Sequence, residues 1–87
     1  MKIKLYGSLR QKAGAAEHET TGTTVHEALA NLCTYHDALR TAIFDGAALR
    51  AHVRVMVNGH DCELADGLET AVSANDQIAI FPPIAGG

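Results

Sequence analysis

The sequence has little of what several classes of protein require. No run approaches the roughly 20 apolar residues of a membrane-spanning helix, and the first six residues alternate instead of forming an apolar leader. Seven basic residues against ten acidic ones give a net charge of -3, so the chain lacks the basic excess that binds nucleic-acid phosphates. Its two cysteines, Cys33 and Cys62, are too few for a disulfide framework and form no CxxC motif. We expect a soluble cytoplasmic protein with free thiols and no membrane or nucleic-acid partner.

The remaining composition favours one small folded domain. The chain has 87 residues, of which 47% are hydrophobic and 20% charged. This is enough apolar material for a single core, and the chain is too short for two. No internal repeat or low-complexity tract interrupts it. We expect a domain at residues 1–82 and a tail at residues 83–87.

One helix has a clear start signal. Thr24 and Glu27 have the spacing of a capping box, in which each side chain satisfies a backbone N–H at the helix start. An apolar stripe follows at helical spacing and predicts a helix that ends near residues 36–37. A short second helix at residues 38–44 is expected to stop at Asp45-Gly46, because glycine tolerates the left-handed cap. Residues 8–13 have room for one helical turn.

Alternating patterns predict the strands. They cover residues 2–6, 53–57, 60–64 and 77–81, with residues 17–20 as an edge strand or a loop. Asn58-Gly59 favours a two-residue hairpin turn between the second and third of these strands. This order of elements predicts an α+β fold of the β-grasp (ubiquitin-like) type. It would have a mixed sheet of about four to five strands, one main helix packed across it and a flexible C-terminal tail.

The C-terminal tail has the composition of a reactive end. Pro82-Pro83 end the last strand because proline has no N–H for the sheet. The following residues, Ile84 and Ala85, lead to Gly86-Gly87. A glycine backbone can pass through a channel too narrow for any Cβ, and it presents an unhindered carboxylate. Such a carboxylate becomes an electrophile for sulfur or amine nucleophiles once it is adenylated.

The tail also carries a resemblance to a known family. The segment from Phe81 to Gly87, FPPIAGG, resembles the C-terminal signature of the MoaD family, the small sulfur-carrying subunits of molybdopterin synthase. That family belongs with ThiS-type carriers and ubiquitin-like proteins. Residues 57–59 and 66–72 resemble a MoaD-like branch that includes the mycobacterial cysteine-synthesis carrier CysO and archaeal ubiquitin-like modifiers. The start of the chain, at residues 3–10, is also similar.

The resemblance implies a carrier and not a catalyst. An adenylating enzyme of the ubiquitin-activating type (MoeB/ThiF-like) would use ATP to activate Gly87, which would then become a thiocarboxylate. The chain itself would bind no cofactor. Gly86 would permit passage of the tail, and Phe81 and Pro82 would steer it together with Pro83, Ile84 and Ala85.

The receiving partner is open at this stage. The resemblance of Phe81-Pro82-Pro83 favours the molybdopterin synthase large subunit (MoaE-like) as sulfur acceptor. The middle segment favours other acceptors, in cysteine, thiamine or tRNA thiolation pathways. A further alternative is a protein modifier whose Gly87 ends in an isopeptide bond to a lysine.

A docking surface for that partner is predicted beside the tail. On the strands at residues 53–57 and 77–81, Arg54, Met56 and Phe81 share the face opposite the core. An exposed methionine and phenylalanine would suit partner binding. The alternative is that a loop covers these side chains or that they are ordinary apolar surface.

The histidines do not indicate a metal site. The five histidines show no i, i+4 pair and no cysteine or carboxylate at finger spacing, so we expect no bound metal. His60 and Cys62 occupy alternate strand positions without a third orienting group, which disfavours a nucleophilic pair.

Overall fold

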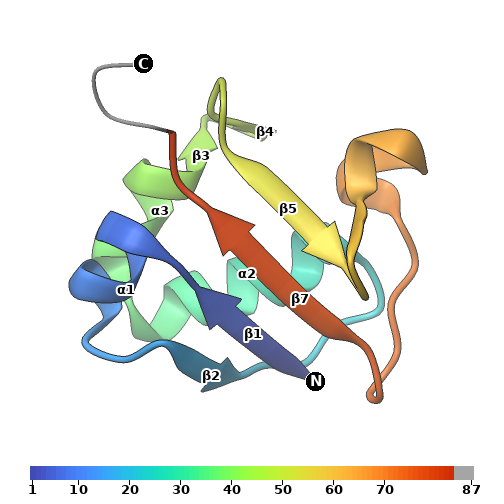
Figure 1. The fold of residues 1–87 in the computed structure, drawn as a ribbon, viewed down its shortest axis with the longest axis horizontal. Coiled ribbons are helices and arrows are strands. Elements are labelled where there is room, and N and C mark those ends of the chain that lie inside the picture. Colours follow the sequence, from blue (N-terminus) through green and yellow to red (C-terminus); the bar gives the residue numbers. More distant parts are fainter. Residues whose placement is uncertain (84–87) are drawn as a thin grey trace.

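Five strands form one mixed sheet in the computed structural model, which describes residues 1–83 (Figure 1). The strand order is β2-β1-β7-β5-β6, with β1 and β7 parallel and the other neighbouring pairs antiparallel. The strands are β1 (Lys2–Leu5), β2 (Glu17–Glu19), β5 (Arg54–Val57), β6 (His60–Asp61) and β7 (Gln77–Phe81). The first and last strands of the chain therefore lie side by side at the centre of the sheet.

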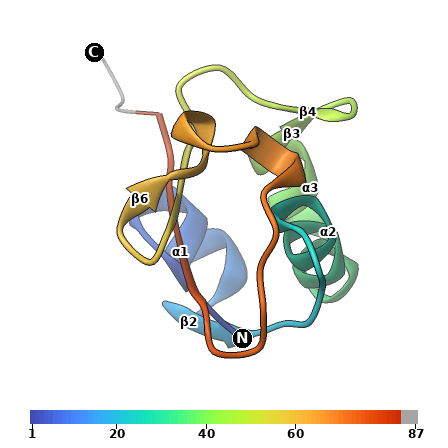
Figure 2. The ribbon, with the colours of Figure 1, turned by 90° about the vertical axis from the view of Figure 1, so that its right-hand side faces the viewer.

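The α-helices cover one face of this sheet. They are α1 (Gly7–Ala13), α2 (Val25–Tyr35) and α3 (Asp37–Ile43). Figure 2 shows α2 and α3 on the same side of the sheet. This arrangement confirms the predicted β-grasp fold, with α2 as the main helix and an additional sheet of two short strands. Within residues 1–83 no helix is both long and apolar enough to cross a membrane.

Alternation along the central strands builds the core. Ile3 and Leu5 on β1 and Ile78 and Ile80 on β7 are at most 1% exposed, as is Val55 on β5. These side chains join one hydrophobic cluster with the apolar stripe of α2, which consists of Val25, Ala28, Leu29, Leu32 and Cys33. Burial of this cluster is the main source of stability for a domain of this size.

The predicted start of α2 is confirmed, with one difference in its cap. Thr24 Oγ1 accepts a hydrogen bond from the Glu27 backbone N–H at 3.2 Å, as a capping box requires. The Glu27 carboxylate, however, accepts from the backbone N–H of Thr23 at 3.0 Å and from its hydroxyl at 3.1 Å. The cap therefore extends one residue upstream and fixes the chain that enters the helix.

The second helix, predicted at residues 38–44, is confirmed to within one residue, but its predicted cap at Asp45-Gly46 is wrong. This helix, α3, ends at Ile43, and Phe44 is extended. Strand β3 (Phe44–Asp45) then pairs antiparallel with β4 (Ala48–Leu49), and Gly46 has φ +65° in the turn between them. An Asp-Gly pair suits a tight hairpin turn as well as a helix end. In the hairpin, the side chain of Phe44 is buried.

The second hairpin is confirmed at its turn but not along its length. Asn58 and Gly59 have φ of 51° and 85°, as the predicted two-residue turn requires. Only His60–Asp61 pair back with β5, and residues 62–64 form the 3-10 helix η1 (Cys62–Leu64). The Asp61 carboxylate accepts from the Glu63 backbone N–H at 2.9 Å, and this cap ends the strand. The chain continues through the 3-10 helix η2 (Gly67–Glu69) to β7.

Candidate functional site at the base of the C-terminal tail

The described part of the tail begins where β7 leaves the sheet. Phe81 is the last residue of β7, and Pro82 and Pro83 follow it. The predicted site residues Ile84, Ala85, Gly86 and Gly87 lie outside the described residues. The structure therefore defines the base from which the predicted reactive end departs.

Five of the predicted partner-binding residues line one shallow hollow at this base. They are Arg54, Met56, Phe81, Pro82 and Pro83. Strand register explains the gathering, because Arg54 is opposite Phe81 and Met56 is opposite Ala79 in the antiparallel β5–β7 pair. Side chains at these positions point to the face away from the core. Binding of a partner in this hollow stays a prediction.

The exposed fraction of Phe81 shows whether this residue belongs to the surface or to the core. Phe81 is 36% exposed, so it lies at the surface and not in the core. Phe81 instead packs sideways against Tyr6, with ring centroids 4.4 Å apart and planes inclined by 13°. Phe81 therefore has one face in contact with the domain and another open to a partner.

The end of β1 completes the base, and the sequence analysis missed it. The Tyr6 backbone N–H donates to the Ile80 carbonyl at 3.2 Å, beside the aromatic stack. The next residue, Gly7, has φ +57° and lies against Pro82, so that a Cβ built on it would be 2.9 Å from Pro82 Cγ. The sequence pattern placed Tyr6 in the first predicted strand, but it did not indicate that Phe81 is its neighbour.

Arg54 is held at the rim of the hollow by an ion pair. Its Nη1 lies 3.0 Å from Asp61 Oδ2, while most of the arginine side chain is exposed. The pKa of the Asp61 carboxyl lies below its usual range, mainly because the backbone N–H of Glu63 donates to it. The Arg54 guanidinium adds a smaller effect in the same direction. A guanidinium has five N–H donors, and within the described residues the Arg54 side chain donates only from Nη1 to Asp61.

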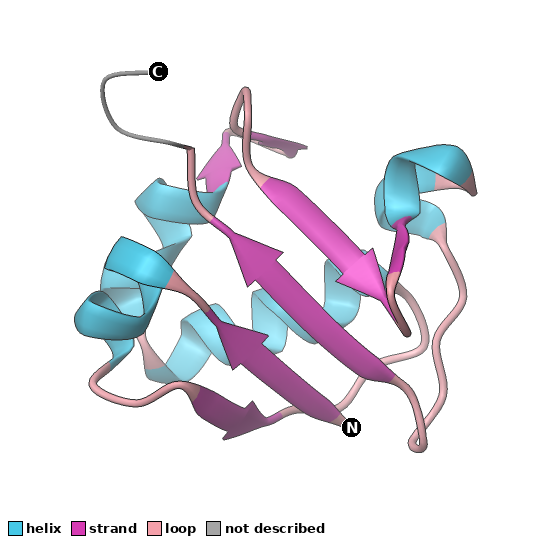
Figure 3. Cartoon of the chain, viewed as in Figure 1, coloured by secondary structure: helices cyan, strands magenta, loops and turns pink. Residues whose placement is uncertain are grey.

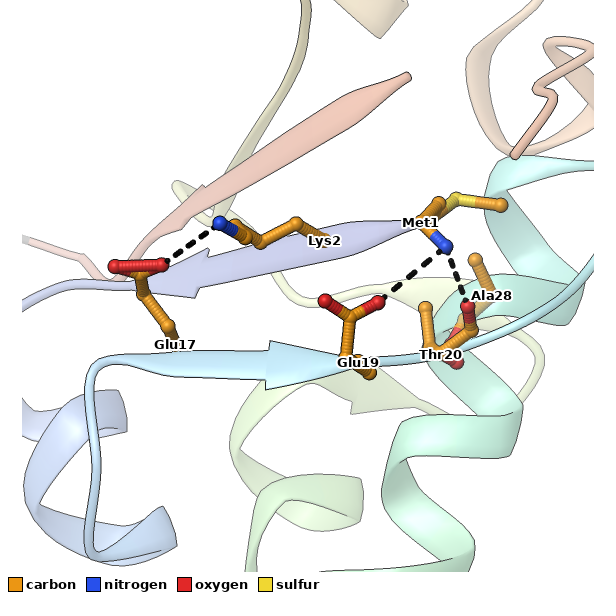
Figure 4. A network of polar contacts seen from close by, with 6 residues as sticks. All are labelled: Met1, Lys2, Glu17, Glu19, Thr20 and Ala28. Atoms are coloured by element: carbon orange, nitrogen blue, oxygen red, sulfur yellow. Dashed lines mark hydrogen bonds and ion pairs between the residues drawn. The ribbon is translucent and has the colours of Figure 1, made fainter. Parts of the chain in front are cut away.

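The sheet face below the hollow is open. In Figure 3 the strands face the viewer and α2 and α3 lie behind them. Lys2 on this face pairs with Glu17 of the edge strand β2 at 3.3 Å. The Met1 ammonium donates to the Thr20 carbonyl at 2.9 Å and lies 3.6 Å from Glu19 (Figure 4). These contacts tie β1 to β2 and so hold the strand that carries Tyr6.

Neither cysteine belongs to the candidate site. Cys33 and Cys62 are free thiols with buried side chains. Burial raises the pKa of both thiols, and the Asp61 and Glu63 carboxylates add to this effect at Cys62. In residues 1–83 no three His, Cys, Asp or Glu side chains gather as metal ligands.

A mixed sheet with a helix across one face, and a chain end that departs through Pro-Pro beside an exposed aromatic stack, defines a ubiquitin-like β-grasp protein. The chain belongs to the ThiS family, which it matches over residues 3–87. Small archaeal modifier protein 1 of Haloferax volcanii is 35% identical over 91 residues, which cover all of both chains. Sulfur carrier protein CysO of Mycobacterium tuberculosis is 31% identical over 77 residues, 88% of this chain and 82% of that protein.

A solved structure agrees with these relatives. One chain of the Amycolatopsis orientalis BexX/CysO complex superposes with a TM-score of 0.90 at 28% identity, over 99% of this chain and 98% of its own. The predicted resemblance to ThiS-type carriers and ubiquitin-like proteins is therefore confirmed. The relatives are named as small carriers or modifiers and not as catalysts.

Proposed function

We propose that this protein is a sulfur carrier whose Gly87 becomes a thiocarboxylate. A MoeB/ThiF-like enzyme adenylates Gly87: the carboxylate attacks the α-phosphorus of ATP and pyrophosphate leaves. A sulfide-level nucleophile then displaces AMP from the acyl adenylate and leaves the thiocarboxylate. The chain is a stoichiometric reagent in this scheme, and the catalytic groups belong to the partner enzymes.

The observation that carries the proposal is a terminal Gly86-Gly87 on a ThiS-family domain. The described base supports it, because the hollow at Arg54, Met56 and Phe81 offers a partner an apolar contact next to the departing tail. Gly87 supplies a carboxylate without a neighbouring side chain, and adenylation supplies the leaving group. The cytoplasmic location predicted from the sequence belongs to this proposal and stays a prediction.

For the acceptor, we propose the molybdopterin synthase large subunit (MoaE-like), on the resemblance of Phe81-Pro82-Pro83 to the MoaD signature. Acceptors in cysteine, thiamine or tRNA thiolation are the alternatives, and the named CysO relatives favour them. In each case the thiocarboxylate sulfur forms a bond to an electrophilic carbon of the acceptor's substrate, either by addition to a double bond or with loss of a leaving group from that carbon. Hydrolysis of the acyl group from the product then returns Gly87 as a carboxylate and leaves the sulfur on the substrate.

A second candidate function has its own support. The full-length match at 35% identity to small archaeal modifier protein 1 favours a protein modifier. The same acyl adenylate would then be attacked by a lysine amine, with AMP as the leaving group and an isopeptide bond at Gly87 as the product.

The mass of the peptide Asp76–Gly87, cut from protein isolated from its own host, tests both functions. This peptide contains no cysteine or methionine, so a gain of about 16 Da is not a sulfoxide. We expect that gain, because sulfur replaces oxygen at Gly87. A peptide branched through Gly87 to a lysine would instead show the modifier. Neither species after incubation with the adenylating enzyme, ATP and a sulfide donor would refute both functions.

Two controls make this test specific. A variant that lacks Gly87 should show no mass gain, while Gly46→Ala, far along the chain from the tail, should show the same gain as the wild type. The acceptor is tested by adding the thiocarboxylated protein to the purified large subunit and its pterin substrate. Loss of the mass gain of about 16 Da supports molybdopterin synthesis, and persistence of this gain refutes this acceptor.

A further inference from the structure

We infer that Gly7 is a positioning residue for activation of the tail: the β1–α1 corner sets the direction in which the chain leaves the sheet at Pro82. This inference rests on the proposed function, since it concerns how Gly87 reaches the adenylating enzyme. It assigns a role to a residue at the opposite end of the chain from the reactive carboxylate.

The contact between Gly7 and Pro82 leaves no room for a side chain. A Cβ on Gly7 would lie 2.9 Å from Pro82 Cγ and 3.5 Å from Pro82 Cδ. Carbon atoms in proteins pack at about 3.5 to 4.0 Å, so the first distance is too short by at least about half an ångström. The ring fixes φ of Pro82 and has no χ1 rotamer that swings Cγ away, so only a change of ring pucker or a shift of the Pro82 backbone can relieve the contact.

The β1 side of this contact is fixed more firmly than the tail side. The Tyr6 backbone N–H is bonded to the Ile80 carbonyl, and the Tyr6 ring is stacked on Phe81. Leu5, one residue earlier, is 1% exposed in the core. Pro82 is joined to the sheet only through its N-terminal neighbour Phe81, the last residue of β7. We therefore expect an added methyl group at Gly7 to displace Pro82 and to leave β1 in place.

A displacement at Pro82 is transmitted along the tail. Proline at positions 82 and 83 restricts the backbone of Phe81 and of Pro82 to extended conformations. A displacement of Pro82 therefore also moves Pro83, and it changes the direction in which the chain leaves the domain. Misplacement of a reacting atom by about 1 Å can already cost about a hundredfold in rate.

Gly14 provides a matched control for the backbone. Gly14 directly follows helix α1, which Gly7 begins, and it also has a positive φ, +82°. A Cβ built on Gly14, however, meets no atom within 4 Å. Gly7→Ala and Gly14→Ala therefore both place alanine in the left-handed region, which strains any residue with a Cβ. Only Gly7→Ala adds the collision with Pro82.

The experiment compares the two variants in pyrophosphate exchange with ATP and the MoeB/ThiF-like enzyme of the same organism. We expect Gly7→Ala to lower kcat by about tenfold or more, with KM for the carrier changed by less than about twofold. Gly14→Ala should keep both constants within about twofold of the wild type. Urea unfolding of both variants checks that each is folded at the assay temperature.

A double-mutant cycle separates the contact from general damage. Pro82→Ala removes the ring atoms that collide, so Gly7→Ala should have no further effect on kcat in a Pro82→Ala background. Equal kcat values for Gly7→Ala and Gly14→Ala would refute the inference alone, as would an unchanged effect of Gly7→Ala in that background. Absence of exchange with the wild type would refute the proposed function, and the inference with it.

Discussion

Replacement of Phe81 by alanine is expected to lower the free energy of unfolding by about 1.5 to 3.5 kcal/mol. Phe81 is 36% exposed, so about two-thirds of it is covered, and full burial of a phenylalanine contributes roughly 1.5 to 3 kcal/mol. Covering two-thirds then contributes about 1 to 2 kcal/mol, and the stack on Tyr6 adds about 0.5 to 1.5 kcal/mol. A domain of this size has about 4 to 13 kcal/mol in total, so even the largest expected loss leaves the folded state as the more populated one.

Urea unfolding measures this loss as a lower midpoint at an unchanged slope. A Tyr6→Ala, Phe81→Ala double-mutant cycle isolates the stacking energy, which we expect at about 0.5 to 1.5 kcal/mol. The same Phe81→Ala protein should bind the adenylating enzyme more weakly, because the open face of the ring is lost. A loss above about 5 kcal/mol would show that Phe81 is a core residue, and a coupling near zero would show that the stack contributes nothing.

Three further predictions concern the rest of the domain. Thr24→Ala should cost about 1 kcal/mol in urea unfolding while Thr24→Ser costs much less, and equal losses would contradict the cap. Hydrogen bonds from the Asn58 amide and from the Ser73 backbone N–H hold the pKa of the Asp76 carboxyl below its usual range. The stability that these bonds contribute is present above about pH 4 and is lost as the pH falls through the folded-state pKa. Asp76→Asn should therefore lose less stability than the wild type over that acid range, and parallel curves would refute this. Cys33 and Cys62 should react with a thiol reagent far more slowly in the folded protein than in the protein unfolded in urea, and rapid labelling of the folded protein would contradict their burial. Cys62→Ala should still carry sulfur, and loss of sulfur carrying would contradict an inert role for this thiol.

Signals that act over a few residues were readable in the sequence. Thr24 and Glu27 marked the start of α2 correctly because a cap depends on atoms three residues apart. Asn58-Gly59 marked a turn for the same reason. Asp45-Gly46 was misread as a helix end because such a pair suits both a helix end and a hairpin, and the pairing of Phe44 with Leu49 decides between them.

The candidate site was readable only in part. Alternation placed Arg54, Met56 and Phe81 on one face, and the structure brings them to one hollow. The contributions of Tyr6 and Gly7 depend on the parallel pairing of β1 with β7, which joins residues more than seventy positions apart. No local pattern specifies that pairing. A glycine directly after a strand was the one available signal for the tight corner.

The pairing of β1 with β7 has a consequence for the order of synthesis. β7 occupies the middle of the sheet, between β1 and β5, yet a ribosome adds it after all the other helices and strands of residues 1–83. A growing chain therefore holds β1 and α2 without the strand that joins them to β5, and long-range pairing of this kind closes late in folding. A chain cut short before residue 77 lacks the central strand, and β1 then has no partner that joins it to β5. The hollow at Arg54, Met56 and Phe81 is lined from both β5 and β7, so it exists only in molecules in which this strand has been made and paired.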